Sequence, residues 1–394
     1  MVAQKPTGAN RFRLAAALDQ AYRVLNQTME YLMPFRLLVS LLLIFLFAVP
    51  AKADDLDTMI GQMIMAGFRG YTVDAHSSIM KDIRERHLGG VILFDYDVEQ
   101  GKRERNIKSP DQVLKLTTDL AAGAEIPLLI AVDQEGGRVQ RLKSDQGFYE
   151  SPSAKVLGTL PNGVVYSEAR SVGKALLDVG FNLNFAPVAD VDVNMESPAI
   201  GKIERSFSAD PARVAECDRI FLDGMASQGI IGCLKHFPGH GSAGGDSHFG
   251  VTDVTDTWSE KELIPYKFLI QNGSAEVIMT AHIFNAKLDA DYPATLSHKV
   301  ITGLLRDKLG FGGVVITDDM NMKAITSQYG QEEAIRLAIE AGADILLFGN
   351  NLTYDPDVVK KAHATIRRLV DEGVIKRTRI NTSYSRIMRL KEML

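Results

Sequence analysis

Eight short apolar runs alternate with amphipathic segments after residue 54, and this alternation constrains the fold more than any other feature. The runs occupy residues 62–68, 90–94, 127–132, 183–188, 230–234, 277–281, 313–317 and 343–349. Continuous apolar runs are typical of parallel strands that are buried on both faces. Eight such strands alternating with helices over about 300 residues predict a single-domain (β/α)8 TIM barrel covering residues 54–394. A doubly wound open sheet is the alternative, because periodicity does not show closure.

Helix starts can be read between these runs. Ser109-Pro110 and Asp210-Pro211 each place a capping residue before a first-turn proline, and residues 259–262 (Ser-x-x-Glu) have the spacing of a capping box. The last two helices are expected to begin at Asp355-Pro356 and to cover 379–394. Glycines shortly before five of the strands predict helix ends: Gly123, Gly180, Gly229, Gly273 and Gly342.

The amino-terminal segment does not follow this pattern. Residues 37–49 are apolar apart from Ser40, Arg36 precedes them, and Ala51-Lys52-Ala53 follows as a small-x-small cleavage site. These features predict a signal peptide over 33–53, with the true start at Met33 and residues 1–32 as a non-native upstream extension. The alternative is an uncleaved anchor, although the apolar core is shorter than the roughly 20 residues of a transmembrane helix.

A cleaved signal predicts a mature chain that begins at Asp54, is periplasmic or secreted, and has no stable membrane anchor. Residues 1–53 carry six Lys/Arg and two Asp/Glu, so the remainder has a net charge of −9, against −5 for the whole chain. A chain this acidic is not expected to bind nucleic acid. Cys217 and Cys233 lie in a helical and a strand pattern, so both are interpreted as buried thiols that form no disulfide.

The run at 230–234 leads into a loop, residues 235–248, that combines three His, one Lys and one Asp with several Gly. Other polar groups also follow predicted strands: Asp133 to Arg141, Asp190 with Asp192, His282, and Asp318 to Met322. In a TIM barrel the loops after the strands meet at one end and carry the active site. The sequence therefore predicts that these residues share one pocket.

Two kinds of chemistry fit this loop poorly. The scattered residues His236, His240, His248 and His282 lack the preorganised His pair of a barrel metallohydrolase. No Gly-x-Ser-x-Gly elbow occurs either. We therefore expect neither a metal ion nor a serine nucleophile.

A carboxylate working with a separate proton donor fits better. Asp318 follows the seventh strand and is a candidate nucleophile, while Asp246 could orient His248 so that the ring protonates a leaving oxygen. Two structural alternatives stay open. Asp318 could cap the next helix, unless Asp319 does so, and Asp246 with His248 could form a solvated turn.

Three stretches of this chain together resemble the single-domain bacterial β-N-acetylglucosaminidases of glycoside hydrolase family 3. The stretches are Lys235 to His248, Asp133 to Arg141, and Thr317 to Met322. Of these, Lys-His-Phe-Pro-Gly-His-Gly is specific to the family, and the Asp-Ser-His ending marks its glucosaminidase branch. The resemblance covers about Asp54 to Leu394.

The resemblance implies catalytic roles for three residues, with Asp318 as nucleophile, His248 as acid/base and Asp246 as the partner of His248. It also implies a set of substrate contacts: Asp133, Arg141, Arg205, Lys235 and His236. Arg141 and Arg138 could instead be structural salt-bridge residues. His240 and His282 are interpreted as supporting hydrogen bonders.

The activity implied is retaining, exo-acting hydrolysis of terminal β-linked N-acetylglucosamine without metal or organic cofactor, with a muropeptide or chitooligosaccharide as the small carbohydrate partner. A β-glucosidase, a glycoside phosphorylase and a non-catalytic sugar-binding barrel remain alternatives. Two departures from the family pattern bear on this. The small residues at 243–245 predict a looser loop, and the export signal leaves the natural substrate open because many relatives act in the cytoplasm.

Overall fold

The structure is a computed structural model that describes residues 20, 23, 24, 56–247 and 250–394. The predicted signal peptide and upstream extension therefore lie outside the described residues, as does His248. Residues 55–394 form one compact unit. Within the described residues, no helix combines the length and apolar character needed to cross a membrane.

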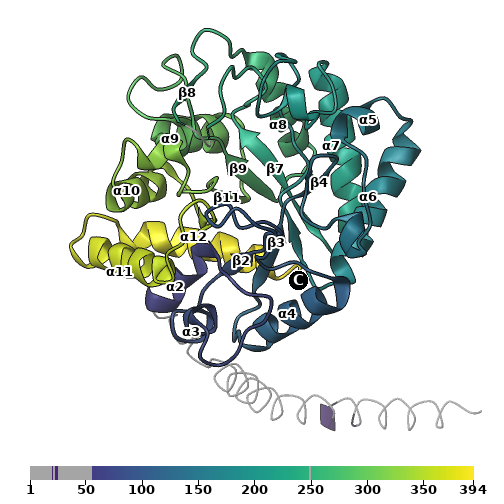
Figure 1. Cartoon of the computed structure of the whole chain (residues 1–394). Coiled ribbons are helices and arrows are strands. Elements are labelled where there is room, and N and C mark those ends of the chain that lie inside the picture. Colours follow the sequence, from purple (N-terminus) through teal and green to yellow (C-terminus); the bar gives the residue numbers. More distant parts are fainter. Residues whose placement is uncertain (1–19, 21–22, 25–55, 248–249) are drawn as a thin grey trace, which may run out of the picture. The chain divides into compact units, whose positions relative to one another are not determined.

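Eight parallel strands form the centre of this unit and are ringed by helices (Figure 1). In spatial order they are β11 (Val314–Ile316), β9 (Val277–Thr280), β7 (Ile231–Phe237), β6 (Leu183–Asn184), β3 (Leu129–Val132), β2 (Gly90–Ile92), β1 (Ile64–Gly67) and β12 (Leu346–Phe348). A parallel bridge between Ile316 and Ile345 joins the two ends of the sheet. The sheet thus curves into a TIM-type barrel, and an open doubly wound sheet is excluded.

Seven of the eight predicted runs contain one of these strands, whereas β7 extends beyond its run at 230–234 to Phe237, so Lys235 and His236 lie on the strand and not in the predicted loop. The residues of the eight strands are almost entirely buried, as expected for strands covered by helices on one face and by core side chains on the other. Two small sheets lie outside the barrel, one of β4 (Gln134–Gly136) with β5 (Val139–Gln140) and one of β8 (Thr252–Asp253) with β10 (Ile283–Phe284). Both small sheets belong to the loops that follow barrel strands.

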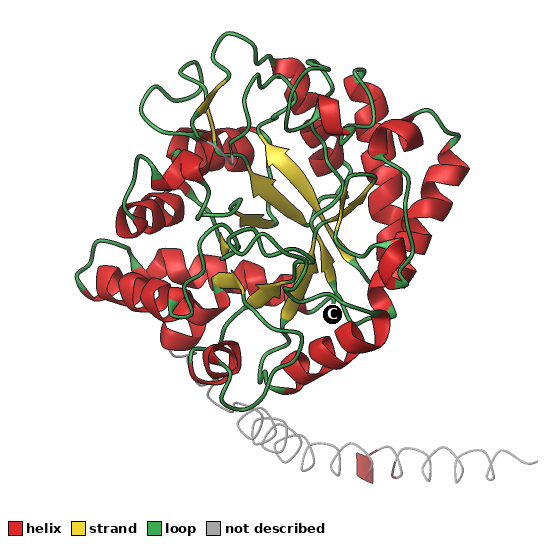
Figure 2. Ribbon diagram, viewed as in Figure 1, coloured by secondary structure: helices red, strands yellow, loops and turns green. Residues whose placement is uncertain are grey.

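Helices surround the barrel, as the red ribbons of Figure 2 show. The α-helices are α2 (Leu56–Gln62), α3 (Ser78–Glu85), α4 (Pro110–Ala122), α5 (Ala154–Gly158), α6 (Asn162–Leu177), α7 (Pro211–Ala226), α8 (Ile264–Gln271), α9 (Lys323–Thr326), α10 (Gln331–Ala341), α11 (Val358–Asp371) and α12 (Arg377–Lys391). The remaining helical segments are η1 (Ser144–Gln146), η2 (Gly201–Ile203), η3 (Glu260–Leu263), η4 (Ala294–Leu296) and η5 (Lys299–Lys308). Cys217 on α7 and Cys233 on β7 are buried free thiols, as predicted.

The predicted helix starts are confirmed at α4 and α7, where Ser109 and Asp210 accept main-chain N–H groups. α11 begins at Val358, slightly later than predicted, because the Asp355 carboxylate accepts the N–H of Asp357 and forms a turn before the helix. The capping box at 259–262 is wrong. The Ser259 side chain makes no capping bond, and Glu262 instead binds the loop after β7.

Candidate active site

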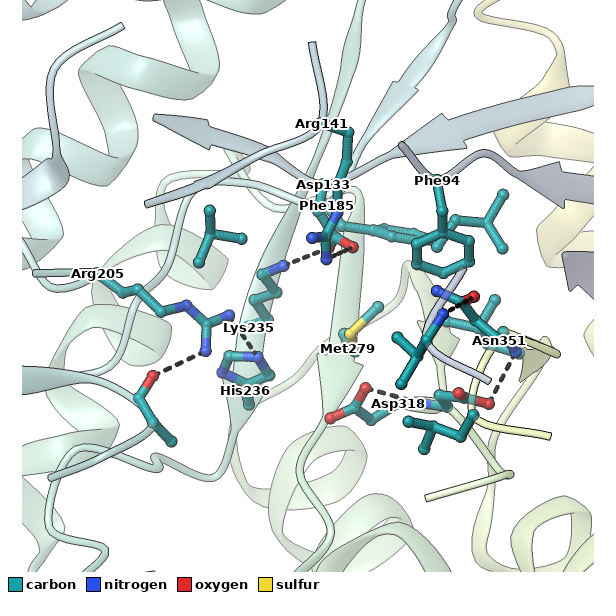
Figure 3. Close-up of a pocket in the computed structure, with 18 of the residues that line it drawn as sticks. Phe94, Asp133, Arg141, Phe185, Arg205, Lys235, His236, Met279, Asp318 and Asn351 are labelled. Carbon is teal, nitrogen blue, oxygen red and sulfur yellow. Dashed lines mark hydrogen bonds and ion pairs between the residues drawn. The ribbon is translucent and has the colours of Figure 1, made fainter. Parts of the chain in front are cut away.

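A cavity of about 260 Å³ opens at the end of the barrel where the strands finish. Seven of the eight predicted site residues line it: Asp133, Arg141, Arg205, Lys235, His236, Asp246 and Asp318. They come from the loops after β3, β6, β7 and β11 and from the end of β7 itself. Figure 3 shows Arg205 and His236 on one side of the cavity and Phe94 and Asn351 on the opposite side.

Asp133 is held by two cations. Its Oδ1 accepts a hydrogen bond from Lys235 Nζ at 2.8 Å, and its Oδ2 accepts one from Arg141 Nη2 at 3.2 Å. Burial alone raises the pKa of the Asp133 carboxyl, but the Lys235 and Arg141 charges outweigh it and hold that pKa below its usual range. Asp133 is therefore an ionised acceptor at neutral pH, suited to bind sugar hydroxyls. Arg141 both forms a salt bridge and lines the cavity, whereas Arg138 is exposed.

Glu135 extends this network beneath the cavity. Arg205 binds both oxygens of the Glu135 carboxylate, with Nε at 2.8 Å and Nη2 at 2.7 Å. Lys235 Nζ lies 2.7 Å from the same carboxylate. Burial raises the pKa of Glu135, and the Arg205 and Lys235 charges outweigh that effect and lower it. The result is a preorganised network in which buried charges of opposite sign alternate.

His236 completes this side of the cavity. Its Nδ1 lies 2.6 Å from Asp190 Oδ2, and its Nε2 lies 3.2 Å from Arg205 Nη2. A guanidinium can only donate, so these partners assign Nε2 as the acceptor and place the ring proton on Nδ1, where it bonds Asp190. Both ring nitrogens thus already have partners in this structure, and His236 orients Arg205.

The first half of the loop after β7, residues 238–242, is held by hydrogen bonds from its main chain to two buried carboxylates. Asp190 Oδ1 accepts the main-chain N–H of His240 at 2.7 Å, and Glu262 Oε2 accepts those of Gly241 and Ser242 at 2.9 and 3.3 Å. Burial raises the pKa of Glu262 to about 7 and lowers that of His240 to about 4. His240 is therefore neutral at pH 7, and it remains a supporting residue beneath the loop.

Asp318 and Asp319 follow β11, and their carboxylates make different contacts. The Asp319 carboxylate accepts the main-chain N–H groups of Asn321 at 2.9 Å and Gly349 at 2.7 Å, which holds the turn. Asp318 lines the cavity, and its Oδ1 accepts the N–H of Asp319 at 2.8 Å. Asp319 thus supplies the carboxylate that fixes the local backbone, and the side chain of Asp318 stays at the cavity.

His282, at the end of β9, fixes the same turn from the neighbouring strand. Its Nε2 lies 3.0 Å from the main-chain oxygen of Asp319, and its Nδ1 lies 2.8 Å from Thr295 Oγ1. Because a carbonyl can only accept, Nε2 must carry a proton in this bond. His282 and Thr295 are both buried. His282 therefore contacts the residue next to Asp318, consistent with a supporting role.

The loop after β7 also brings Asp246 to the cavity, where its side chain is half-buried. His248, its predicted partner, lies outside the described residues. In residues 56–247 and 250–394, no group of three or more His, Cys, Asp or Glu side chains is arranged to hold a metal ion. The described part of the site is a set of carboxylates and cations around a space for a polar ligand.

Sequence reasoning placed three further residues among the polar groups of the site without finding their contacts. Glu135 and Asp190 were given no role, and Asp319 was considered only as a helix cap in place of Asp318. Glu135 and Asp319 lie close to Asp133 and Asp318 in the sequence, and this proximity was the available signal. Their partners, Arg205, His236 and Gly349, are 70, 46 and 30 residues away, and sequence spacing does not show those contacts.

A barrel with a charged cavity at the ends of its strands is the architecture of an enzyme site, and comparison with known proteins identifies the family. The Glycosyl hydrolase family 3 N terminal domain matches residues 55–390. The chain is 36% identical to the beta-hexosaminidase of Tolumonas auensis over 294 residues, which are 73% of this chain and 83% of that protein. It is 30% identical to beta-hexosaminidase A of Pseudoalteromonas piscicida, covering 85% of this chain and 61% of that relative.

A solved structure gives the same result in three dimensions. The family 3 beta-N-acetylglucosaminidase of Paenibacillus sp. str. FPU-7 aligns with a TM-score of 0.79 and 36% identity, covering 86% of this chain and 63% of that one. The chain therefore spans less than two thirds of two of these three relatives. It belongs to the beta-hexosaminidases of glycosyl hydrolase family 3.

Proposed function

We propose that this protein is a retaining, exo-acting β-N-acetylglucosaminidase that removes terminal β-linked N-acetylglucosamine from peptidoglycan fragments or chitooligosaccharides. The observation that carries the proposal is the shared cavity of Asp318, Asp246 and the Asp133–Lys235–Glu135–Arg205 network. At about 260 Å³ the cavity is smaller than the roughly 300–1,000 Å³ of pockets for drug-sized ligands. That size suits one sugar ring and thus removal of a terminal residue.

In the proposed reaction the charged network holds the terminal sugar. The ionised Asp133 accepts from ring hydroxyls, while Lys235, Arg141 and Arg205 donate to hydroxyls or to the 2-acetamido oxygen. The Asp318 carboxylate attacks the anomeric carbon as His248 protonates the departing glycosidic oxygen, giving a covalent glycosyl-Asp318 intermediate. His248, oriented by Asp246, then takes a proton from a water molecule whose oxygen attacks the anomeric carbon, and the bond to Asp318 breaks, which releases the sugar and restores the carboxylate. No metal or cofactor enters these steps.

The test compares an aryl N-acetyl-β-glucosaminide with the matching aryl β-glucoside, using purified wild-type protein and Asp318→Ala. We expect the wild type to hydrolyse the first substrate far faster than the second, and Asp318→Ala to abolish turnover because no covalent intermediate can form. Preference for the glucoside would favour a β-glucosidase. Sugar 1-phosphate formed in phosphate buffer would indicate a phosphorylase, and binding without turnover would indicate a sugar-binding protein.

The role of His248 has its own test in leaving-group dependence. A sugar leaving group needs a proton, whereas dinitrophenolate departs unaided. We therefore expect His248→Ala to slow the first step by roughly 10² to 10⁴ for a disaccharide and much less for the dinitrophenyl glycoside. Equal slowing of both substrates would make His248 a binding residue.

We also propose that residues 33–53 direct export and that the mature protein begins at Asp54 in the periplasm or outside the cell. The apolar segment and the small-x-small site support this. Amino-terminal sequencing of the native protein is the test. A sequence that includes residues before Met33 would contradict the assigned start.

A further inference from the structure

The loop after β2 reverses the usual distribution of polar and apolar side chains. Asp95 and Asp97 are 1% and 0% exposed, whereas the alternating residues Tyr96 and Val98 are 40% and 46% exposed. Both Tyr96 and Val98 line the cavity that contains Asp318. Burying carboxylates while exposing apolar side chains is unfavourable for folding, so this arrangement needs a reason.

The two buried carboxylates anchor the loop through cations. Asp97 Oδ2 accepts hydrogen bonds from Arg69 Nε and from Arg105 Nη1, each at 2.7 Å. Arg105 is fully buried and also donates to the main-chain oxygen of Asn350. Lys143 Nζ lies 2.6 Å from Asp95 Oδ2. The loop is therefore attached to the scaffold at both residues that flank Tyr96.

Asn351, from the loop after β12, fixes the backbone between these anchors. Its Nδ2 donates to the main-chain oxygen of Tyr96 at 3.0 Å, and its Oδ1 accepts the N–H of Val98 at 3.2 Å. Figure 3 shows Asn351 across the cavity from Arg205 and His236. The backbone of Tyr96 and Val98 is thus held on the side of the cavity that lies across from Arg205 and His236.

We propose that Tyr96 and Val98 form a platform for the group on the leaving side of the cleaved bond, and that this group is a second pyranose ring stacked on Tyr96. The inference rests on the proposed function. In the proposed reaction the terminal sugar lies against the charged network. Tyr96 and Val98 line the same cavity but are 40% and 46% exposed, so we assign them to its open side, where the leaving group extends. A tyrosine ring has an apolar face and a polar edge, which matches the C–H face and hydroxyl edge of a pyranose.

The experiment measures kcat/KM for chitobiose and for ethyl N-acetyl-β-glucosaminide, whose leaving group has no ring. We expect Tyr96→Ala to lower the ratio of chitobiose to ethyl glycoside about tenfold, the order of an aromatic stacking contribution. Tyr96→Phe keeps the ring and should stay within about twofold of the wild type. Tyr166→Ala is the matched control, because Tyr166 lies on α6 and is 38% exposed but does not line the cavity.

The outcomes separate this inference from the proposed function. If the wild type cleaves both substrates and the Tyr96→Ala ratio stays within about twofold of its value, the platform is overturned while the activity stands. Equal slowing of both substrates would also overturn the platform, since Tyr96 would then contact only the terminal sugar. If the wild type cleaves neither substrate, the proposed function fails and the platform fails with it. Thermal melting of each variant checks that the barrel remains folded.

Discussion

The two halves of the loop after β7 differ in how closely the rest of the molecule packs against their glycines. In the first half, a methyl group added at Gly241 would lie 1.7 Å from the main-chain oxygen of Val191. In the second half, methyl groups added at Gly244 or Gly250 would meet no described atom within 4 Å. The scaffold thus packs tightly against Gly241, beside the proposed sugar-binding network, and leaves open space at Gly244, although Ala243 and Ser247 on either side are buried.

This contrast suggests a division of labour. The proposed binding groups are mutually paired, so they are preorganised before a sugar arrives. The second half contains the small residues 243–245 that predicted a looser loop, and of these Gly244 is exposed and Gly245 half-buried, whereas Ala243 is buried. In the proposed mechanism, the hydrogen-bonded first half of the loop helps to fix the position of the sugar. The second half, which carries Asp246, must then act on a sugar in that position.

The largest expected effect comes from breaking the fixed network at its centre. Glu135→Gln removes the charge that Arg205 and Lys235 share, and the Glu135 and Lys235 side chains are each only 3% exposed. Breaking a buried ion pair from one side typically costs 3–5 kcal/mol, so we expect the free energy of unfolding to fall by about 3 kcal/mol. Urea denaturation measures it.

Glu99→Gln is the matched control for that substitution. Glu99 also pairs with an arginine, Arg69, at 2.6 Å, but its side chain is 40% exposed. Exposed pairs contribute about 0–1 kcal/mol, so this variant should unfold almost like the wild type. Equal losses in the two variants would mean that the buried Glu135 network contributes no more to stability than an exposed ion pair.

The fold and the site were predictable from the sequence to different degrees. All eight strands were located because most of each strand is apolar, and the cavity was found because polar residues stand at or after the strand ends. The end of β7 was missed, since its last residues include Lys235 and His236. The pairing within the cavity was not found. Glu135 contacts Arg205 70 residues away, and Glu262 resembled a cap for its own helix but binds Gly241 across 21 residues. Side-chain pairing depends on the packed barrel, which local patterns do not encode.

A second prediction concerns how the free energy of unfolding depends on pH through Glu262, which accepts the main-chain N–H groups of Gly241 and Ser242. Its pKa is raised from 4.5 to about 7 by burial, so its contribution to stability is fully present below pH 4.5 and is lost as pH rises through 7. A shift of this size corresponds to roughly 3 kcal/mol at most. We expect Glu262→Gln to remove this fall in the free energy of unfolding between pH 4.5 and 7.

The measurement must be a difference between wild type and variant. The pKa of His240 is lowered to about 4, so His240 acts in the opposite direction and adds stability as pH rises between about 4 and 6.5. Urea denaturation of both proteins at several pH values isolates the Glu262 contribution, because His240 is present in each. Parallel pH profiles would show that Glu262 does not titrate in this range.

A third prediction compares two glycines on either side of the loop's midpoint. Gly241→Ala forces a methyl group against the Val191 carbonyl, and overpacking of this kind typically costs 1–3 kcal/mol. Gly244→Ala enters open space and should change the free energy of unfolding by no more than about 0.5 kcal/mol. The same denaturation assay compares the pair. A larger loss for Gly244→Ala would reverse the proposed contrast between the two halves.

The smallest expected effect tests whether the contact between His282 and Asp319 positions the proposed nucleophile, Asp318. His282 binds the main-chain oxygen of Asp319, so His282→Asn should shorten the side chain and release the turn that carries Asp318. A displaced nucleophile slows the first chemical step, and we expect kcat/KM for aryl N-acetyl-β-glucosaminides to fall about tenfold. Because Asp318 attacks in the same step for every substrate and His248 remains to protonate the leaving group, the fall should be similar for good and poor leaving groups, unlike that in His248→Ala.

Two further measurements distinguish positioning from general destabilisation. His282→Gln can extend an amide N–H toward the same carbonyl and should recover much of the lost kcat/KM, although it also removes the ring that contacts Thr295. Inhibition by N-acetylglucosamine should remain close to that of the wild type in both variants, since the binding network lies on other strands. If Gln and Asn lose equal activity, or if product inhibition weakens in parallel with turnover, His282 supports the barrel as a whole. The contrast between a preorganised binding site and a less closely packed catalytic segment would then be supported only by the loop after β7.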